Sequence, residues 1–496
     1  MKAVLWKGLV VVGLFCLATS LLSAQTFTSL ADFERSNGTG PLQIIQGLNG
    51  NFYGVTFSGG SDPYCPPSSD CGTVFEITPA GKVITLHNFC SELQCADGYY
   101  ANGLMQASNG NLYGTTRYRG AHYGGTIFEL TPAGKFTTLY SFCAQTNCTD
   151  GSRPVGTLIE ATNEELYGLT ASGGGTKCQN GCGTMFQISL SGQFASLFSF
   201  CAKADCAKEG RNPFAGLTAA PNGNFYGTTY AGGRQQAGTV FTITPAGLLT
   251  KLYDFYSQPN GADGWDVEAP LTLGNDGNLY GTTFAGGVNR GGTVFKITPT
   301  GQFTSIYSFC SSSTCLTGFN PIAPVALGSD GNFYGTTWAG GGADDGVAFQ
   351  ITPAGEYAEL YSFCSEADCK DGYLPNGGII QSTDGSFYGT TLWGGDVTCG
   401  NGIEAGCGTF YSISMGLGPY VQPQPAFAPI GRQIQILGNN LTGATSVTFN
   451  GTPATFKVVS GTYILATVPA GATTGPIEVT TPNGTLSSNV AFQLIP

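Results

Sequence analysis

Charged residues are scarce in this sequence. Only 10% of its 496 residues are Asp, Glu, Lys or Arg, and the formal net charge is -12 at pH 7. No run of Lys or Arg forms the basic block that binding to nucleic acid or to an anionic membrane requires. We therefore expect no nucleic-acid partner. The 76 glycines and the 12% of aromatic residues are instead typical of a turn-rich all-β protein.

Histidine is almost absent as well, and the chain contains only His87 and His122. His87 occupies the position that Tyr140 and Tyr307 hold in similar stretches, so we expect it in a strand, whereas His122 lies in a loop. Nothing marks the nucleophile of a Ser-His-Asp arrangement. The Gly-rich segments lack the Lys and the strand-loop-helix context of a phosphate-binding loop. The sequence therefore contains no recognisable catalytic motif.

Long apolar runs are missing except at the N-terminus. Lys2 and Lys7 lead into the apolar segment Leu9 to Leu22, and a plausible cleavage site precedes Gln25. This pattern predicts a signal peptide over residues 1–24, with a membrane anchor as the alternative. No later stretch is long and apolar enough to cross a bilayer. The predicted location is therefore secreted, either extracellular or periplasmic and on the cell surface.

Cysteine, in contrast, is plentiful, with 17 residues. Cys16 lies in the leader, and the other sixteen form local pairs. Local spacing, an even count and an export signal together imply disulfides. Zinc is the competing interpretation, but it needs four converging ligands, and most pairs belong to different repeats. The predicted disulfides are Cys65–Cys71, Cys90–Cys95, Cys143–Cys148, Cys178–Cys182, Cys201–Cys206, Cys310–Cys315, Cys364–Cys369 and Cys399–Cys407.

A short stretch ending in Tyr-Gly-Thr-Thr, best seen at Asn222 to Thr229, recurs along the chain. Consecutive copies are 54 to 60 residues apart, and a fixed period of this size indicates a repeat architecture. The copies of the Tyr-Gly pair are Tyr53-Gly54, Tyr113-Gly114, Tyr167-Gly168, Tyr226-Gly227, Tyr280-Gly281, Tyr334-Gly335 and Tyr388-Gly389.

Each repeat predicts four short strands, separated by an Asn-Gly or Asp-Gly turn, a Gly-Gly loop and a Thr-Pro-Ala-Gly turn. Four antiparallel strands repeated radially form a β-propeller. The fold class is therefore all-β, with a seven-bladed propeller over residues 25–416. The last repeat lacks its fourth strand, and residues 27–33 carry that pattern. We predict that they pair with Gly408 to Ile413 and close the ring, which removes an exposed sheet edge.

The composition changes after Gly416, where cysteines stop and prolines cluster. Apolar residues then alternate with polar ones in several short segments separated by turn signals. This pattern predicts an immunoglobulin-like β-sandwich over residues 417–496. The alternating pairs are Ile434 and Ile436, Val447 and Phe449, and Ile477 and Val479.

Two resemblances follow from these strings. The repeats resemble the GloVer tandem repeats of secreted bacterial proteins of the choice-of-anchor type, through Asn-Phe-Tyr-Gly-Thr-Thr, Gly-Thr-Val-Phe-x-Ile-Thr-Pro-Ala-Gly and Leu-Tyr-Ser-Phe-Cys. The tail is similar to an IPT/TIG domain at Gly438 to Leu441, Val447 to Gly451 and Val468 to Gly471. Both resemblances imply secretion and surface interaction, and neither brings a catalytic set.

The geometry of an antiparallel meander places the tight turns at one end of the propeller and the irregular loops, with all cysteine pairs, at the other. Loops on a rigid scaffold are where binding residues usually lie. Exposed aromatic residues there suit stacking on sugar rings or a protein hot spot. For Phe284 and Trp338, packing between blades is the alternative. The candidate ligand-binding residues are Trp265, Trp338, Trp393, Tyr118, Tyr123, Tyr230, Phe284 and Arg290.

Loop carboxylates provide a second set of candidates: Asp263, Asp266 and Glu268 in one loop, and Asp344 and Asp345 in another. Such acids could cleave a glycosidic bond, could bind calcium, or could simply be solvated. Two functions follow. The favoured one is a non-catalytic binding protein for an extracellular glycan or protein, without cofactor or metal. The alternative is a secreted carbohydrate-active enzyme, a hydrolase or lyase, that uses these acids.

Overall fold

The computed structural model describes residues 25–61, 71–175, 178, 180–202, 206–396, 399 and 406–496. The predicted signal peptide and Cys65 lie outside these ranges. Within them, no helix is long and apolar enough to cross a membrane.

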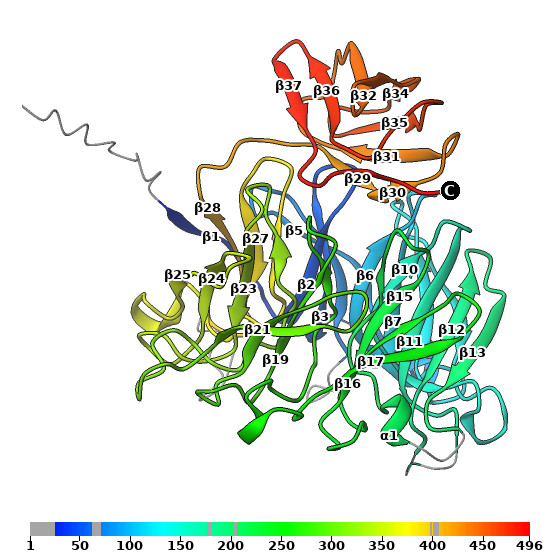
Figure 1. Ribbon diagram of the computed structural model, residues 1–496, viewed down its shortest axis with the longest axis vertical. Helices are drawn as coiled ribbons and strands as arrows, with labels where there is room; N and C mark the ends of the chain where they lie inside the picture. Colours follow the sequence, from blue (N-terminus) through cyan, green and yellow to red (C-terminus); the bar gives the residue numbers. More distant parts are fainter. Residues whose placement is uncertain are drawn as a thin grey trace, which may run out of the picture.

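Seven four-stranded antiparallel sheets confirm the predicted seven-bladed propeller (Figure 1). The first strands of neighbouring blades contact one another and form the inner wall. From the inner to the outer strand, blades 1 to 4 are β2 (Thr39–Gln46), β3 (Phe52–Ser58), β4 (Thr73–Ile77), β5 (Val83–Asn88); β6 (Tyr99–Gln106), β7 (Leu112–Tyr118), β8 (Thr126–Leu130), β9 (Phe136–Ser141); β10 (Ser152–Glu160), β11 (Glu165–Ser172), β12 (Thr184–Ser189), β13 (Phe194–Ser199); and β14 (Thr218–Ala219), β15 (Phe225–Thr229), β16 (Thr239–Ile243), β17 (Leu249–Asp254). Blades 5 to 7 are β18 (Thr272–Leu273), β19 (Leu279–Thr283), β20 (Thr293–Ile297), β21 (Phe303–Ser308); β22 (Ala326–Leu327), β23 (Phe333–Thr337), β24 (Val347–Ile351), β25 (Tyr357–Ser362); and β26 (Ile379–Gln381), β27 (Phe387–Thr390), β28 (Thr409–Ser414), β1 (Thr26–Asp32).

The repeated Tyr-Gly pair has a packing explanation, which blade 2 illustrates. The Tyr113 hydroxyl donates to Glu129 at 3.0 Å and accepts from the side chain of Asn109 in the adjacent turn at 2.8 Å. A Cβ on Gly114 would lie 2.5 Å from the ring of Phe128, so no larger residue fits. The tyrosine hydroxyl bonds the Asn or Asp of the turn in the other blades too. The motif therefore builds the blades and does not mark a site.

The ring closes as predicted. Strand β1 pairs with β28, with Phe27 opposite Ile413 and Asp32 opposite Thr409. The Phe33 amide then donates to the Gly408 carbonyl at 2.9 Å. The last blade thus takes its outer strand from the other end of the chain, which confirms the predicted closure.

The C-terminal residues form a separate β-sandwich, as expected. One sheet has the order β29 (Gln422–Gln424), β31 (Gln433–Leu437), β35 (Tyr463–Thr467) and β34 (Phe456–Val458), and the other β33 (Thr452–Pro453), β32 (Ser446–Phe449), β36 (Ile477–Thr481) and β37 (Gly484–Ser487). A short parallel pair joins β30 (Phe427–Ala428) to β38 (Gln493–Leu494). The three predicted pairs of alternating apolar residues are all in its buried core.

The sandwich sits on the turn end of the propeller (Figure 1). Thr462 donates to the Leu48 carbonyl at 2.6 Å, and Arg432 pairs with Glu164 at 2.7 Å. The hydroxyl of the buried Tyr420, which lies just before β29, donates to the carbonyl of Gln381 in blade 7 at 2.9 Å. The opposite end carries the loops and α1 (Cys206–Glu209), and among the described residues it lies away from the sandwich.

Candidate binding site at the loop end of the propeller

Disulfides stabilise the loops at this end of the propeller. Seven of the predicted bridges are present, and Cys71 is also disulfide-bonded, although its predicted partner Cys65 lies outside the described residues. These bridges favour an oxidising environment. The seven are Cys90–Cys95, Cys143–Cys148, Cys178–Cys182, Cys201–Cys206, Cys310–Cys315, Cys364–Cys369 and Cys399–Cys407.

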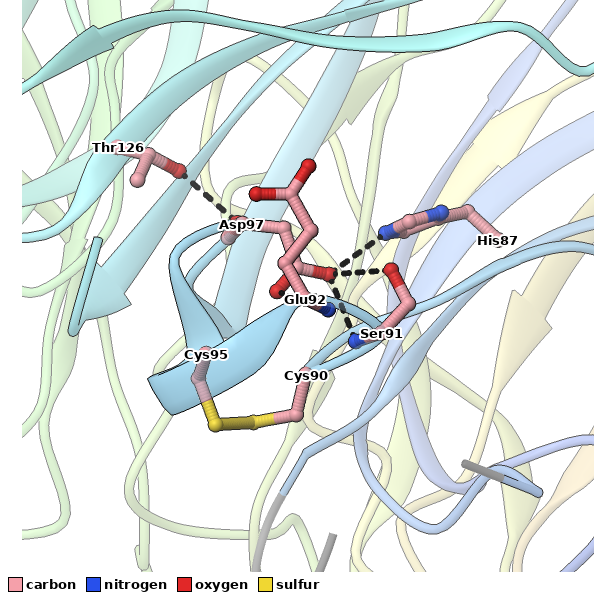
Figure 2. The surroundings of a disulfide bond; sticks show 7 residues. All are labelled: His87, Cys90, Ser91, Glu92, Cys95, Asp97 and Thr126. Carbon is pink, nitrogen blue, oxygen red and sulfur yellow. Dashed lines mark hydrogen bonds and ion pairs between the residues drawn. A yellow bond between two sulfur atoms is a disulfide. The ribbon is translucent and has the colours of Figure 1, made fainter. Parts of the chain in front are cut away.

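A buried aspartate organises several of these loops, as Figure 2 shows for Asp97. One of its carboxylate oxygens accepts from the Ser91 amide at 3.0 Å, and the ring Nε2 of His87 lies 3.1 Å from it. His87 belongs to β5, as expected, and takes the place of a strand tyrosine. In this family of loops Asp150 and Asp371 are likewise fully buried and each accepts from such a tyrosine. These acids therefore hold loops in shape.

Asp263 is the same structural acid in the loop before blade 5, and this corrects its grouping with Asp266 and Glu268. It is fully buried and accepts from the Tyr253 hydroxyl at 2.9 Å and the Ser257 amide at 2.8 Å. Its carboxylate is thus enclosed within its own loop and cannot reach a ligand. The sequence does not reveal this difference, because the side chain of Asp263 is buried and that of Asp266, only three residues later, is partly exposed.

Aromatic and arginine side chains from different blades meet at the loop end. The guanidinium of Arg117, at the end of β7, lies 5.8 Å from the ring centre of Tyr118 and 5.3 Å from that of Phe214. Phe214 packs against Tyr230, with 5.1 Å between ring centres. Arg117 thus bridges blade 2 to blade 4 through two cation–π contacts. All four side chains are partly exposed.

The aromatic surface continues toward blade 1 and along blade 2. Tyr100 lies between Phe57 and Tyr118, at 4.6 and 5.6 Å between ring centres. Arg153 of blade 3 approaches the Tyr118 ring at 5.8 Å. Tyr100 and Arg153 belong to the inner strands β6 and β10. These side chains therefore extend the aromatic surface to the loop ends of three neighbouring blades.

Two carboxylates form the polar side of this region. Burial raises the pKa of Asp266. Burial and then the Asp266 charge raise the pKa of Glu268, against the opposing effect of Arg117. Burial and then both carboxylates raise the pKa of Tyr230. These groups therefore share one electrostatic environment. We call Arg117, Tyr118, Phe214, Tyr230, Asp266 and Glu268 the mouth cluster.

Other candidate residues lie elsewhere on the loop end. Tyr123 is 60% exposed at a loop tip, where Arg119 lies 5.4 Å from its ring centre. Arg290 is exposed in the equivalent loop of blade 5. In blade 6, Asp344 accepts from the Gly340 amide, and burial and then neighbouring carboxylates raise the pKa of Asp345. Trp393 is half-buried in blade 7.

The position four residues after the repeated tyrosine is equivalent in every blade, and it contains Arg117 and Tyr230. Phe284, half-buried, and Trp338, which is 37% exposed, occupy it in blades 5 and 6. Arg117 shares this position with four aromatic residues in other blades, so the repeat alignment identifies it. It is absent from the predicted candidates because these are mainly aromatic residues. The seven residues are Phe57, Arg117, Ala171, Tyr230, Phe284, Trp338 and Leu392.

Trp265 has a packing role that the sequence did not reveal. Its ring lies 5.4 Å from that of Tyr256, and a Cβ on Gly261 would lie 2.6 Å from it. Tyr256 and Gly261 occupy the positions of the two loop cysteines in other repeats. The Tyr256–Trp265 contact therefore replaces the missing disulfide.

We expect Trp265→Ala to lower the melting temperature, because it removes this half-buried contact from a loop without a disulfide. A loss of about 2 kcal/mol in unfolding free energy is consistent with partial burial of an aromatic ring. Calorimetry checks this, with Trp393→Ala as the comparison in a loop that has a disulfide. An unchanged melting temperature for Trp265→Ala would rule out the packing role.

Two groups of potential metal ligands occur among the described residues. The first contains Cys178, Cys182, Cys201 and Cys206, and the second contains Asp345, Cys364 and Cys369. The mouth carboxylates belong to neither group.

Family comparison matches residues 15–210 and 178–403 to the Gloeobacter/Verrucomicrobia repeat, and residues 421–494 to the IPT/TIG domain. The chain belongs to the Gloeobacter/Verrucomicrobia repeat family. The predicted GloVer resemblance is thereby confirmed. No curated protein matches this chain.

Solved structures show how the Gloeobacter/Verrucomicrobia repeats compare with other propellers. A fungal alcohol oxidase of the AA5 family, in complex with copper, has 12% identity and a TM-score of 0.51, covering 95% of this chain and 99% of that chain. A puromycin hydrolase has 11% identity and a TM-score of 0.44, and the match covers 82% of this chain and 59% of that chain. A luciferin-regenerating enzyme has 11% identity and a TM-score of 0.40, and the match covers 80% of this chain and 97% of that chain. At such identities, the first similarity supports the fold alone.

Proposed function

We propose that this chain is a secreted, non-catalytic protein that binds an extracellular glycan at the mouth cluster. The observation that carries the proposal is the meeting of partly exposed rings, an arginine and two carboxylates from several blades at the loop end of the propeller. Aromatic faces stack on the apolar faces of sugar rings. Arginine and carboxylate groups complement sugar hydroxyls, which both donate and accept hydrogen bonds.

Several features of the scaffold support this assignment. The sandwich domain contacts the turn end, for example through Thr462 and Leu48, which favours the loop end as the binding surface. Disulfides hold several neighbouring loops, although the loop of Asp266 and Glu268 has none, and this limits the ordering cost of binding. The predicted signal peptide and the disulfides together favour export.

A carbohydrate-active enzyme is the second candidate, and one observation favours it. Asp266 and Glu268 both have a raised pKa in a partly exposed setting, which suits a general acid. Asp263 cannot take part because it is enclosed within its loop. An enzyme of this kind would release reducing ends, whereas a binding protein retains its glycan intact.

A polysaccharide screen that measures both retention and reducing-end release tests the proposal. We expect the wild type to be retained without release, and Tyr118→Ala and Tyr230→Ala to bind at least about tenfold more weakly, or about 1.4 kcal/mol. Tyr123→Ala is the matched control, since its ring lies at a loop tip outside the cluster. Retention on no glycan, or equal loss in all three variants, would reject the proposal. Release that Glu268→Gln abolishes would establish the enzyme instead.

A further inference from the structure

Two cysteine pairs that the sequence presents separately come together in blade 3. Cys178 and Cys182 lie between β11 and β12, and Cys201 and Cys206 follow β13. All four sulfur atoms lie within 4.8 Å of one another. Cys182 and Cys201 are fully buried. Because both pairs belong to one repeat, the expectation drawn from pairs in different repeats does not apply to this blade.

The spacing of these four residues is similar to that of structural zinc sites. Three residues separate Cys178 from Cys182, eighteen separate Cys182 from Cys201, and four separate Cys201 from Cys206. Two close pairs joined by a spacer of roughly 15 to 20 residues are a zinc signature. Tetrahedral thiolates at about 2.3 Å from zinc are roughly 3.8 Å apart. The four sulfurs are thus close enough for one ion to bind them all after small movements.

The loop after β13 also differs from its equivalents in other blades. The loops of Cys90, Cys143 and Cys364 each contain a short 3-10 turn, η1 (Leu93–Cys95), η2 (Thr146–Cys148) and η4 (Ala367–Cys369). The blade 3 loop has one more residue before its glycine and contains α1 instead. Its acid, Glu209, accepts from the Cys201 amide at 2.9 Å. This departure occurs where a second cysteine pair lies alongside.

We propose that Cys178, Cys182, Cys201 and Cys206 form a zinc site in the reduced protein, and that the two disulfides are the oxidised form of that site. Two molecules of a small thiol reduce each disulfide and leave joined as one disulfide. The two protein S–S bonds break, and four protein thiols form. On binding Zn²⁺ these thiols release four protons and become thiolate ligands.

The site is connected to the mouth cluster through the backbone. The Asn212 amide donates to the Cys182 carbonyl at 2.8 Å, and the Arg211 amide donates to the Ala231 carbonyl at 2.7 Å. Phe214 follows two residues after Asn212, and Tyr230 directly precedes Ala231. The zinc and disulfide states would therefore anchor Phe214 and Tyr230 differently. The metal proposal itself does not depend on glycan binding.

Metal analysis of the purified full-length protein tests this inference. The protein is reduced with a small thiol, freed of the reductant without air, mixed with Zn²⁺ and gel-filtered before elemental analysis. We expect a single zinc ion per reduced chain and none per oxidised chain. The double variant Cys178→Ser, Cys182→Ser should lose the ion. The control variant Cys143→Ser, Cys148→Ser removes one isolated pair and should retain it.

Circular dichroism during the same experiment establishes whether the reduced chain is folded. A reduced chain that binds no zinc, whether folded or not, overturns the proposal, as does equal loss of zinc in both double variants. If the variant at positions 178 and 182 does not fold, Co²⁺ replaces Zn²⁺ in the reduced wild type. An absorption spectrum of tetrahedral coordination by four thiolates then supports the site, and any spectrum with fewer thiolates overturns it.

Discussion

Deletion of residues 26–33 is expected to abolish the folded propeller rather than merely shorten one blade. Residues 26–33 connect three blades through their side chains. Phe27 stacks on Tyr361 of blade 6 at 3.7 Å between ring centres, and on Tyr411 of blade 7 at 5.4 Å. Phe33 is fully buried and packs against Phe75 of blade 1 at 4.9 Å. The deletion would also expose the edge of β28, which favours aggregation.

Soluble yield and the melting curve measure this effect. Where the deleted chain does not express, Phe33→Ala provides a milder test, since removing a buried Phe costs about 3–5 kcal/mol. Thr28→Ala is the control, because that exposed side chain lies on the same strand. A deleted chain with an unchanged melting curve would show that the ring does not depend on β1.

The blades could be derived from the sequence because each is specified locally. The Tyr113 hydroxyl and the close approach of Gly114 to Phe128 are contacts within one blade. The same contacts recur at a nearly constant period, so the number of sequence repeats gives the number of blades. Ring closure followed because the missing strand pattern of the last blade reappears at the N-terminus. The docking of the sandwich could not be derived, since pairs such as Arg432 with Glu164 join distant, unremarkable residues.

The site was harder to predict, because its residues come from different blades. Asp263 and Asp266 are three positions apart, yet one is fully buried and the other is partly exposed at the loop end. Trp265 between them supports its own loop. Arg117 reaches Phe214 across blade 3, whose equivalent residue is the small Ala171. Such relations depend on tertiary packing, which the strand pattern does not encode.

Arg117→Met is expected to weaken glycan binding at neutral pH about a hundredfold, or roughly 2.8 kcal/mol. The substitution removes a charged hydrogen-bond donor, worth about 1.5–3 kcal/mol. It also removes the cation–π contacts with Tyr118 and Phe214, worth about 0.5–1 kcal/mol each where exposed. Arg119→Met is the matched control, because Arg119 lies two residues along and contacts Tyr123 outside the cluster.

The pH dependence of binding separates this mechanism from a simple loss of contact area. Burial and then Asp266 raise the pKa of Glu268, and Arg117 partly offsets them. If the carboxylate form of Glu268 accepts sugar hydroxyls, binding is strong above this raised pKa and falls as the pH decreases through it. Removing Arg117 raises the pKa of Glu268 further. The pH at which binding is half-maximal should therefore increase in Arg117→Met and stay unchanged in Arg119→Met. Titrations of affinity against pH measure both midpoints, with melting curves to confirm folding. Identical midpoints in the two variants would mean that Arg117 and Glu268 do not act together on the ligand.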